Sequence, residues 1–128
     1  MMVEFDSLTG VKRQFENQEL IITKTMKEGN EDGLVVRIEN GRLKYLFDSK
    51  SGRPEGFLMN FYPNGMIKNL RENDIDSEGQ YIEFYDTGLV KEIGYRKLGK
   101  MTGWIFRYDE NGDLVSKTRY QYGERIQD

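Results

Sequence analysis

The 128 residues suffice for one domain and include no cysteine and no histidine, which excludes disulfide bonds, thiolate chemistry and the commonest general base. A formal net charge of −3 argues against a general nucleic-acid-binding protein, which would carry an excess of cations. No run of 18 apolar residues occurs, and the N-terminus lacks an apolar segment of signal-peptide length. We therefore expect a cytoplasmic protein with no membrane and no nucleic acid among its partners.

The chain is a repeat. Its clearest copies are GFLMNFYPNG from residue 56, GQYIEFYDTG from residue 79 and GWIFRYDENG from residue 103. Their leading glycines continue a series with intervals of 23, 23, 23 and 24 residues: Gly10, Gly33, Gly56, Gly79 and Gly103. A fixed period of this length is typical of repeat arrays. It predicts an N-terminal cap, 1–9, and one array, 10–128, of five β-hairpin repeats: 10–32, 33–55, 56–78, 79–102 and 103–128.

The first segments fit this pattern least well. In residues 1–9, Val3 and Phe5 alternate with polar residues, as expected for a capping edge strand. The unit 10–32 has Gln18-Glu19 where other units carry Asn-Gly. We expect this unit to have lost its turn, while the β-branched run 20–25 still predicts a strand.

From residue 33 each unit predicts two strands around a tight turn. Asn40-Gly41 separates LVVRIE from RLKYLF, and Asn-Gly between such runs favours a type I′ turn. The same device recurs at Asn64-Gly65 and Asn111-Gly112, with Thr87-Gly88 as a variant. The segments between hairpins, including Gly52, are interpreted as linkers. We expect about ten strands of roughly five or six residues.

Alternate positions predict two different sheet faces. The first, third and fifth positions after the leading glycines are apolar except for Gln80, and we expect them to form the core, with Trp104 in it. They are Leu34, Val36, Ile38, Phe57, Met59, Phe61, Gln80, Ile82, Phe84, Trp104, Phe106 and Tyr108. The opposite face is half polar. No helical periodicity supplies a cover for the apolar face, so either the sheet coils on itself or a second chain covers it.

The unit G-[aromatic or aliphatic]-x-x-x-[F/Y]-[Y/D]-x-N-G resembles the variant MORN repeat, which occurs in tandem in bacterial proteins, many of them labelled antitoxins of the YwqK family. The resemblance covers residues 33 to 126 well and 10 to 32 poorly. It implies an all-β fold in which stacked hairpins form one elongated, twisted antiparallel sheet. It also implies an antitoxin or immunity role.

Catalysis would have to rely on carboxylates, lysines or hydroxyls, and open hairpin edges are poor places to raise a carboxyl pKa. We therefore expect no enzyme, no cofactor and no metal ion. The acidic run 72–86 contains Asp74 and Asp76, interpreted either as part of a solvated linker or as an acidic patch for a basic protein.

A second candidate patch lies on the half-polar face, where aromatic rings with polar tips are typical of interfaces. Its members are Tyr62, Tyr81, Glu83 and Tyr85. The competing interpretation is that these tyrosines only stabilise the sheet through cross-strand pairs.

The sequence thus predicts a non-enzymatic protein-binding repeat module, in its specific form the antitoxin or immunity protein that neutralises a co-encoded toxin by occlusion. The main alternative is a structural or self-assembling repeat that forms a homo-oligomer. Attachment to an anionic membrane surface is less favoured, because it needs a cluster of lysines and arginines, and the nearest group, Arg96, Lys97 and Lys100, is too small.

Overall fold

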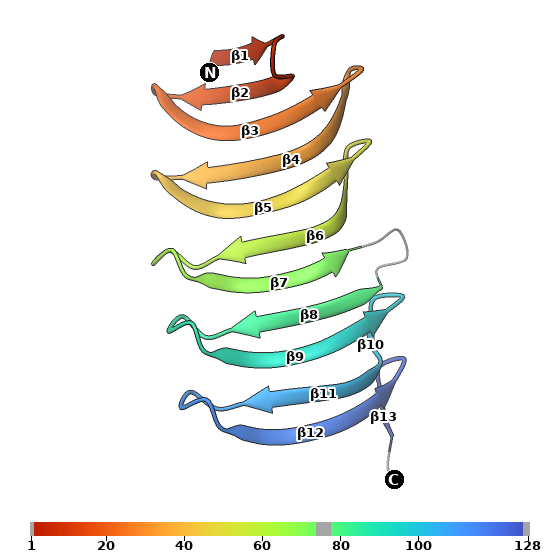
Figure 1. The fold of residues 1–128 in the computed structure, drawn as a ribbon. Coiled ribbons are helices and arrows are strands. Elements are labelled where there is room, and N and C mark those ends of the chain that lie inside the picture. The colour runs from red at the N-terminus through yellow and green to blue at the C-terminus, as the bar shows by residue number, and fades with distance from the viewer. Residues whose placement is uncertain (1, 74–77, 127–128) are drawn as a thin grey trace.

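The computed structural model describes residues 2–73 and 78–126, which form thirteen β-strands and no helix (Figure 1). The strands are β1 (Met2–Asp6), β2 (Val11–Glu16), β3 (Glu19–Lys27), β4 (Asn30–Glu39), β5 (Arg42–Lys50), β6 (Arg53–Phe61), β7 (Ile67–Asn73), β8 (Gly79–Phe84), β9 (Val90–Lys97), β10 (Lys100–Met101), β11 (Gly103–Tyr108), β12 (Leu114–Gln121) and β13 (Glu124–Ile126).

All these strands belong to one antiparallel sheet. Its order follows the chain from β1 to β9 and then β11 to β13, with β10 paired to β9. The two ends of the chain lie at opposite ends of the stack (Figure 1). The predicted all-β, elongated antiparallel sheet is confirmed. Because the described elements all lie in this single layer, none of them forms a second layer over either face.

The structure has more strands than predicted because the segments expected to be linkers are tight turns. Ser51 and Gly52 both have positive φ, 52° and 82°, as in the two-residue type I′ turn. The interpretation of Gly52 as a linker residue was therefore wrong. Paired positive φ values recur along this edge at Glu28-Gly29, Leu98-Gly99 and Tyr122-Gly123.

The turns at the other edge differ from the prediction in two ways. Asn40-Gly41 is a two-residue turn with φ values of 52° and 74°, as expected. The first unit also keeps its turn, at Asn17-Gln18 with φ values of 52° and 67°, so the expected loss of this turn was wrong. Asparagine tolerates the left-handed region at the first turn position, and the second position holds a strained glutamine.

The three remaining hairpins have three-residue loops instead of type I′ turns. In one of them, Gly65 N–H donates to Tyr62 C=O at 2.9 Å and Tyr62 N–H donates to Met66 C=O at 2.8 Å. This is a β-turn followed by one glycine in the left-handed region. Only that glycine needs positive φ, which explains why the β-branched Thr87 is accepted before Gly88.

The glycine that begins each 23-residue unit lies where the chain passes from one hairpin into the next. Gly33, with φ of +114°, lies where β4 gains extra residues relative to β3. A Cβ at this position would lie 3.1 Å from the Thr25 side chain. The other four leading glycines also have positive φ. The repeat therefore marks a recurring backbone irregularity that glycine alone adopts without strain.

We name the two faces of the sheet after Val35 and Val36, which are adjacent in β4 and point to opposite sides. The Val36 face carries a continuous cross-strand row: Val36, Leu46, Met59, Leu70, Ile82, Ile93 and Phe106, followed by Lys117. The Val35 face carries the parallel row with Phe47, Leu58, Arg71, Tyr81, Gly94 and Ile105.

Burial is reversed relative to the sequence prediction. The buried apolar side chains are Val35, Tyr81 and Ile105, at 2%, 3% and 0% exposure, and all three lie on the Val35 face. On the Val36 face, Leu34 is 47% exposed and Trp104 is 40% exposed, so the placement of Trp104 in the core was wrong. The physical reason lies partly in Gly94, whose missing side chain lets Tyr81 and Ile105 lie against the sheet.

Candidate functional site

The predicted tyrosine patch is not a set of exposed anchors. Tyr81 is only 3% exposed, so it cannot contact a partner directly, and its assignment to a binding surface was wrong. Its hydroxyl donates to Glu92 Oε2 at 2.8 Å. Burial, followed by this hydrogen bond to a carboxylate, raises the pKa of Tyr81 above its ordinary value.

Tyr62 and Tyr85 tie neighbouring hairpins together. Tyr62 Oη donates to Phe84 C=O at 2.6 Å, and Tyr85 Oη donates to Tyr108 C=O at 2.7 Å. Each bond spans one repeat. Since both hydroxyls are engaged inside the sheet and both rings are partly buried, the contacts favour the stabilising interpretation for these two tyrosines.

Glu83 lies in the same cross-strand row as Glu92, with which it is directly paired. Glu92 is the centre of a polar network, because it also accepts from Arg107 Nε at 2.6 Å. Hydrogen bonds to Tyr120 and then to Glu92 raise the pKa of Arg107. The network joins β8, β9, β11 and β12, so it links two hairpins on the Val35 face.

The predicted acidic patch is only partly described. Asp74 and Asp76 lie outside the described residues. Glu72 accepts Gln80 N–H at 3.1 Å and Glu78 accepts the Tyr95 hydroxyl at 2.6 Å. These two carboxylates therefore hold strand ends in place.

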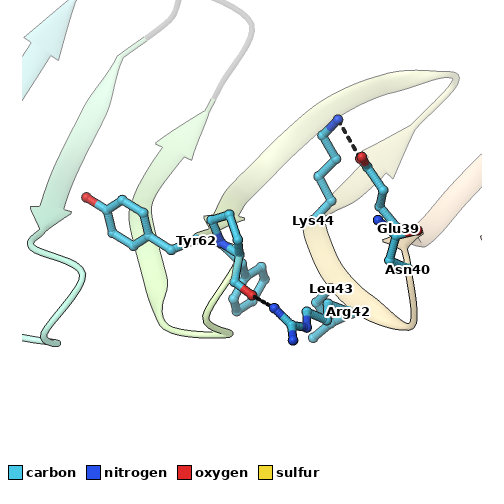
Figure 2. Close-up of a pocket in the computed structure, with 8 residues that line it drawn as sticks. Glu39, Asn40, Arg42, Leu43, Lys44 and Tyr62 are labelled. Atoms are coloured by element: carbon cyan, nitrogen blue, oxygen red, sulfur yellow. Dashed lines mark hydrogen bonds and ion pairs between the residues drawn. The ribbon is translucent and has the colours of Figure 1, made fainter.

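An open cleft of about 640 Å³ lies between the β4–β5 and β6–β7 turns (Figure 2). Its apolar part is formed by Leu43, Phe61 and Pro63. The cleft lies where the second unit lacks a bridging tyrosine. Its sixth residue after the leading glycine is Glu39, whereas the same position in the next two units holds Tyr62 and Tyr85. Without such a tyrosine, a cleft is left between the two hairpin ends.

Charged groups at this cleft are satisfied locally. Glu39 pairs with Lys44 at 2.8 Å, and the hydrogen bond from Lys44 lowers the pKa of Glu39. Arg42 Nη1 donates to Pro63 C=O at 2.5 Å. Figure 2 shows the Tyr62 ring directed away from this ion pair, toward the following hairpin. The cleft can receive an apolar side chain, but it presents no unpaired charge at its centre.

The larger feature is the apolar row of the Val36 face. Each of its seven members from Val36 to Phe106 is partly exposed, and no described element covers them. At its C-terminal end the row passes from apolar side chains to aromatic rings paired with cations. Trp104 and Phe106 pair across β11 and β12 with Arg119 and Lys117, and we name these four residues the Trp104 site.

Within the described ranges, no three Asp or Glu side chains come close enough to share a metal ion. The same ranges contain no helix capable of crossing a membrane. The surface features of the described ranges are an apolar row, a cation-flanked tryptophan and a cleft.

No family model and no curated protein matches the chain. It is similar to a mutant of TarM from S. aureus, crystallised with fondaparinux, α-GlcNAc-glycerol and UDP, at 10% identity and a TM-score of 0.51 over 79% of this chain and 20% of that chain. A second TarM structure matches at 10% identity and a TM-score of 0.49, over 75% and 20% of the two chains. The chain spans about a fifth of the length of TarM, and the likeness concerns the fold alone.

Sequence reasoning missed two features that the structure makes prominent. The first is Gly94, although a glycine inside a strand signals close approach of another group. The second is the pairing of Lys117 and Arg119 with Trp104 and Phe106. Alternation along β11 and β12 places all four on one face, and this could have been found by aligning the two strands around Asn111-Gly112.

Proposed function

We propose that this protein is a non-enzymatic binding module that docks a partner protein on its Val36 face. The observation that supports it is the uncovered apolar row from Val36 to Phe106. A row of this kind on a single-layer sheet is normally covered by a second layer, and a partner protein would supply that layer.

The exposed area of the chain supports the same proposal. A compact monomer of 15.1 kDa would expose about 7,100 Å², whereas this chain exposes 8728 Å². The seven strands that carry the row, β4 to β9 and β11, span roughly 29 Å at a spacing of about 4.8 Å. A surface of that length and about 17 Å width buries roughly 1,000 Å² in total on docking, which is at the lower limit for a specific interface.

In its specific form, the proposal is that the partner is a co-encoded toxin and that the sheet neutralises it by occlusion. This form rests on the resemblance of the repeat to the variant MORN unit. The absence of histidine and cysteine and the open, solvent-accessible sheet support a binding role over catalysis.

The test pairs the protein with the products of adjacent genes, by pull-down and by rescue of growth. Ile82→Asp places a charge in the middle of the row, and Leu34→Asp places one on the same face beside the row, at an exposed position that folding tolerates. Both should lose binding and protection. Leu8→Asp, at a position that is 95% exposed outside the row, is the matched control and should keep both. Equal binding by all three variants would contradict docking on the Val36 face.

A second candidate function, self-assembly, is favoured by the N-terminal edge. Among the described strands, β1 has a neighbour on one side only, and Met2, Val3 and Phe5 are 58%, 50% and 58% exposed. Exposed apolar edge strands pair with other chains. Light scattering over a range of concentrations would show a growing mass for the parent and a monomer for Val3→Lys/Phe5→Lys.

A further inference from the structure

The Trp104 site combines an open aromatic ring with two cations. Lys117 Nζ lies 4.4 Å from the centre of the Trp104 ring and 5.9 Å from the centre of the Phe106 ring. Arg119 Cζ lies 5.8 Å from the Trp104 ring. The tryptophan is still 40% exposed, so the cations flank the ring without closing it.

Neither cation of this site has a carboxylate within ion-pair distance among the described residues. Elsewhere on the sheet the structure does place carboxylates on cations, as between Lys24 and Glu31 at 2.7 Å and between Arg107 and Glu92 at 2.6 Å. The Trp104 site therefore carries a local charge of about +2 at the end of an otherwise neutral apolar row.

We propose that the Trp104 site binds an acidic segment of a partner protein, in which carboxylates flank an aromatic or large aliphatic side chain. The proposal rests on the proposed function and adds the chemistry of the partner. The apolar side chain would pack on the exposed part of Trp104, and the carboxylates would accept hydrogen bonds from Lys117 and Arg119. Arginine next to an aromatic ring is a frequent energetic centre of protein interfaces.

Nucleic acid is a poorer match for this surface. A phosphate backbone needs a track of cations, and the Val36 face continues from the Trp104 site toward acidic side chains. Asp48 pairs with Leu34 and Glu72 pairs with Phe57, so both carboxylates lie on this face. Glu72 on β7 lies four strands from β12, roughly 19 Å away at about 4.8 Å per strand. A nucleic acid that follows the row over that distance would meet these carboxylates, whereas a short acidic segment would not reach them.

Trp104 is the only tryptophan in the chain, so its fluorescence reports on this site alone. The protein is titrated with three N-acetylated, C-amidated pentapeptides, E-E-F-E-E, Q-Q-F-Q-Q and K-K-F-K-K, and with an eight-nucleotide oligothymidylate. We expect a saturable change with the acidic peptide, at least tenfold tighter than with the neutral one, and weakening at high salt. Tighter binding of the oligothymidylate, or equal binding of all three peptides, would overturn the proposal.

The paired variant Lys117→Gln/Arg119→Gln should bind the acidic peptide about tenfold more weakly. Its matched control is Lys68→Gln/Lys91→Gln, which removes two cations that lie 5.8 Å from the Tyr62 and Tyr85 rings. The control should change affinity less than about twofold. An equal loss in both pairs would mean that general charge, and not the site, attracts the peptide, and this would overturn the proposal.

Failure of this inference is distinguishable from failure of the proposed function. If the acidic peptide does not bind, while Ile82→Asp still abolishes capture of a partner, the docking face stands and the acidic specificity is wrong. If the peptide binds but Ile82→Asp leaves capture of the partner unchanged, the Trp104 site acts without the apolar row.

Discussion

Gly94→Ala tests how the buried side of the sheet is packed. Its φ lies outside the left-handed region, so backbone strain is not the issue. An added Cβ would lie 2.5 Å from Ile105 Cδ1 and 2.6 Å from Tyr81 Oη, both closer than real contacts allow. Overpacking of this kind costs about 1–3 kcal/mol, offset by about 0.5–1 kcal/mol because alanine suits a strand better than glycine. We expect a net loss of about 1–2 kcal/mol in urea melts followed by circular dichroism.

The double variant Gly94→Ala/Ile105→Val tests whether the loss of stability comes from the contact between the added Cβ and Ile105. Ile105→Val removes the Cδ1 atom and alone should cost about 0.5–1.5 kcal/mol. Combined with Gly94→Ala, the loss should fall short of the sum by at least about 0.5 kcal/mol, because the contact is relieved. Gly99→Ala is the control: its φ is +77° and nothing lies within 4 Å, so its cost should add to that of Ile105→Val. Additive losses for Gly94→Ala would refute the reasoning.

Three further predictions follow from burial and hydrogen bonding. Val35→Ala should cost about 2 kcal/mol in urea melts and Leu34→Ala less than about 1 kcal/mol, although leucine is larger; the opposite order would restore the Val36 face as the core. Tyr85→Phe should lower the free energy of unfolding by about 0.5–1.5 kcal/mol while leaving partner capture intact; lost capture without lost stability would return this tyrosine to the interface. Because the pKa of folded Tyr81 lies above its unfolded value near 10, the folded chain keeps a proton that the unfolded chain releases. Stability should therefore decline above pH 10 by up to about 1.4 kcal/mol per pH unit, and melts of Tyr81→Phe should show a flatter decline.

The sequence predicts the hairpin repeat because its signals are local. Asn40-Gly41 and the leading glycines mark turns and backbone irregularities that depend only on φ and ψ. Gly52 was misread because a Ser-Gly pair is a weaker turn signal than Asn-Gly. Gln18 was missed because a glutamine in the left-handed region is disfavoured locally and is held there by the pairing of β2 with β3.

The burial of each face could not be predicted in the same way. The pattern of apolar residues identifies alternate faces, but it does not tell which face is crowded by the geometry of the sheet. Tyr81 is buried because Gly94 provides room and Glu92 accepts its hydroxyl, and both residues lie on a different strand. Likewise Trp104 is exposed because none of the strands in residues 2–73 and 78–126 covers the Val36 face. Such properties depend on pairing register, which is settled only in three dimensions.

Among the described strands, extensive contacts join only those that are adjacent in the sheet, and the bridging tyrosines reach no farther than the next hairpin. No hairpin therefore depends on a distant one. In such an array, whole units of 23 or 24 residues can be gained or lost by duplication or deletion while the remaining units keep their structure. The length of the docking face would then change in steps of one hairpin, roughly 10 Å each. Partners of different size could be matched by arrays with different numbers of hairpins.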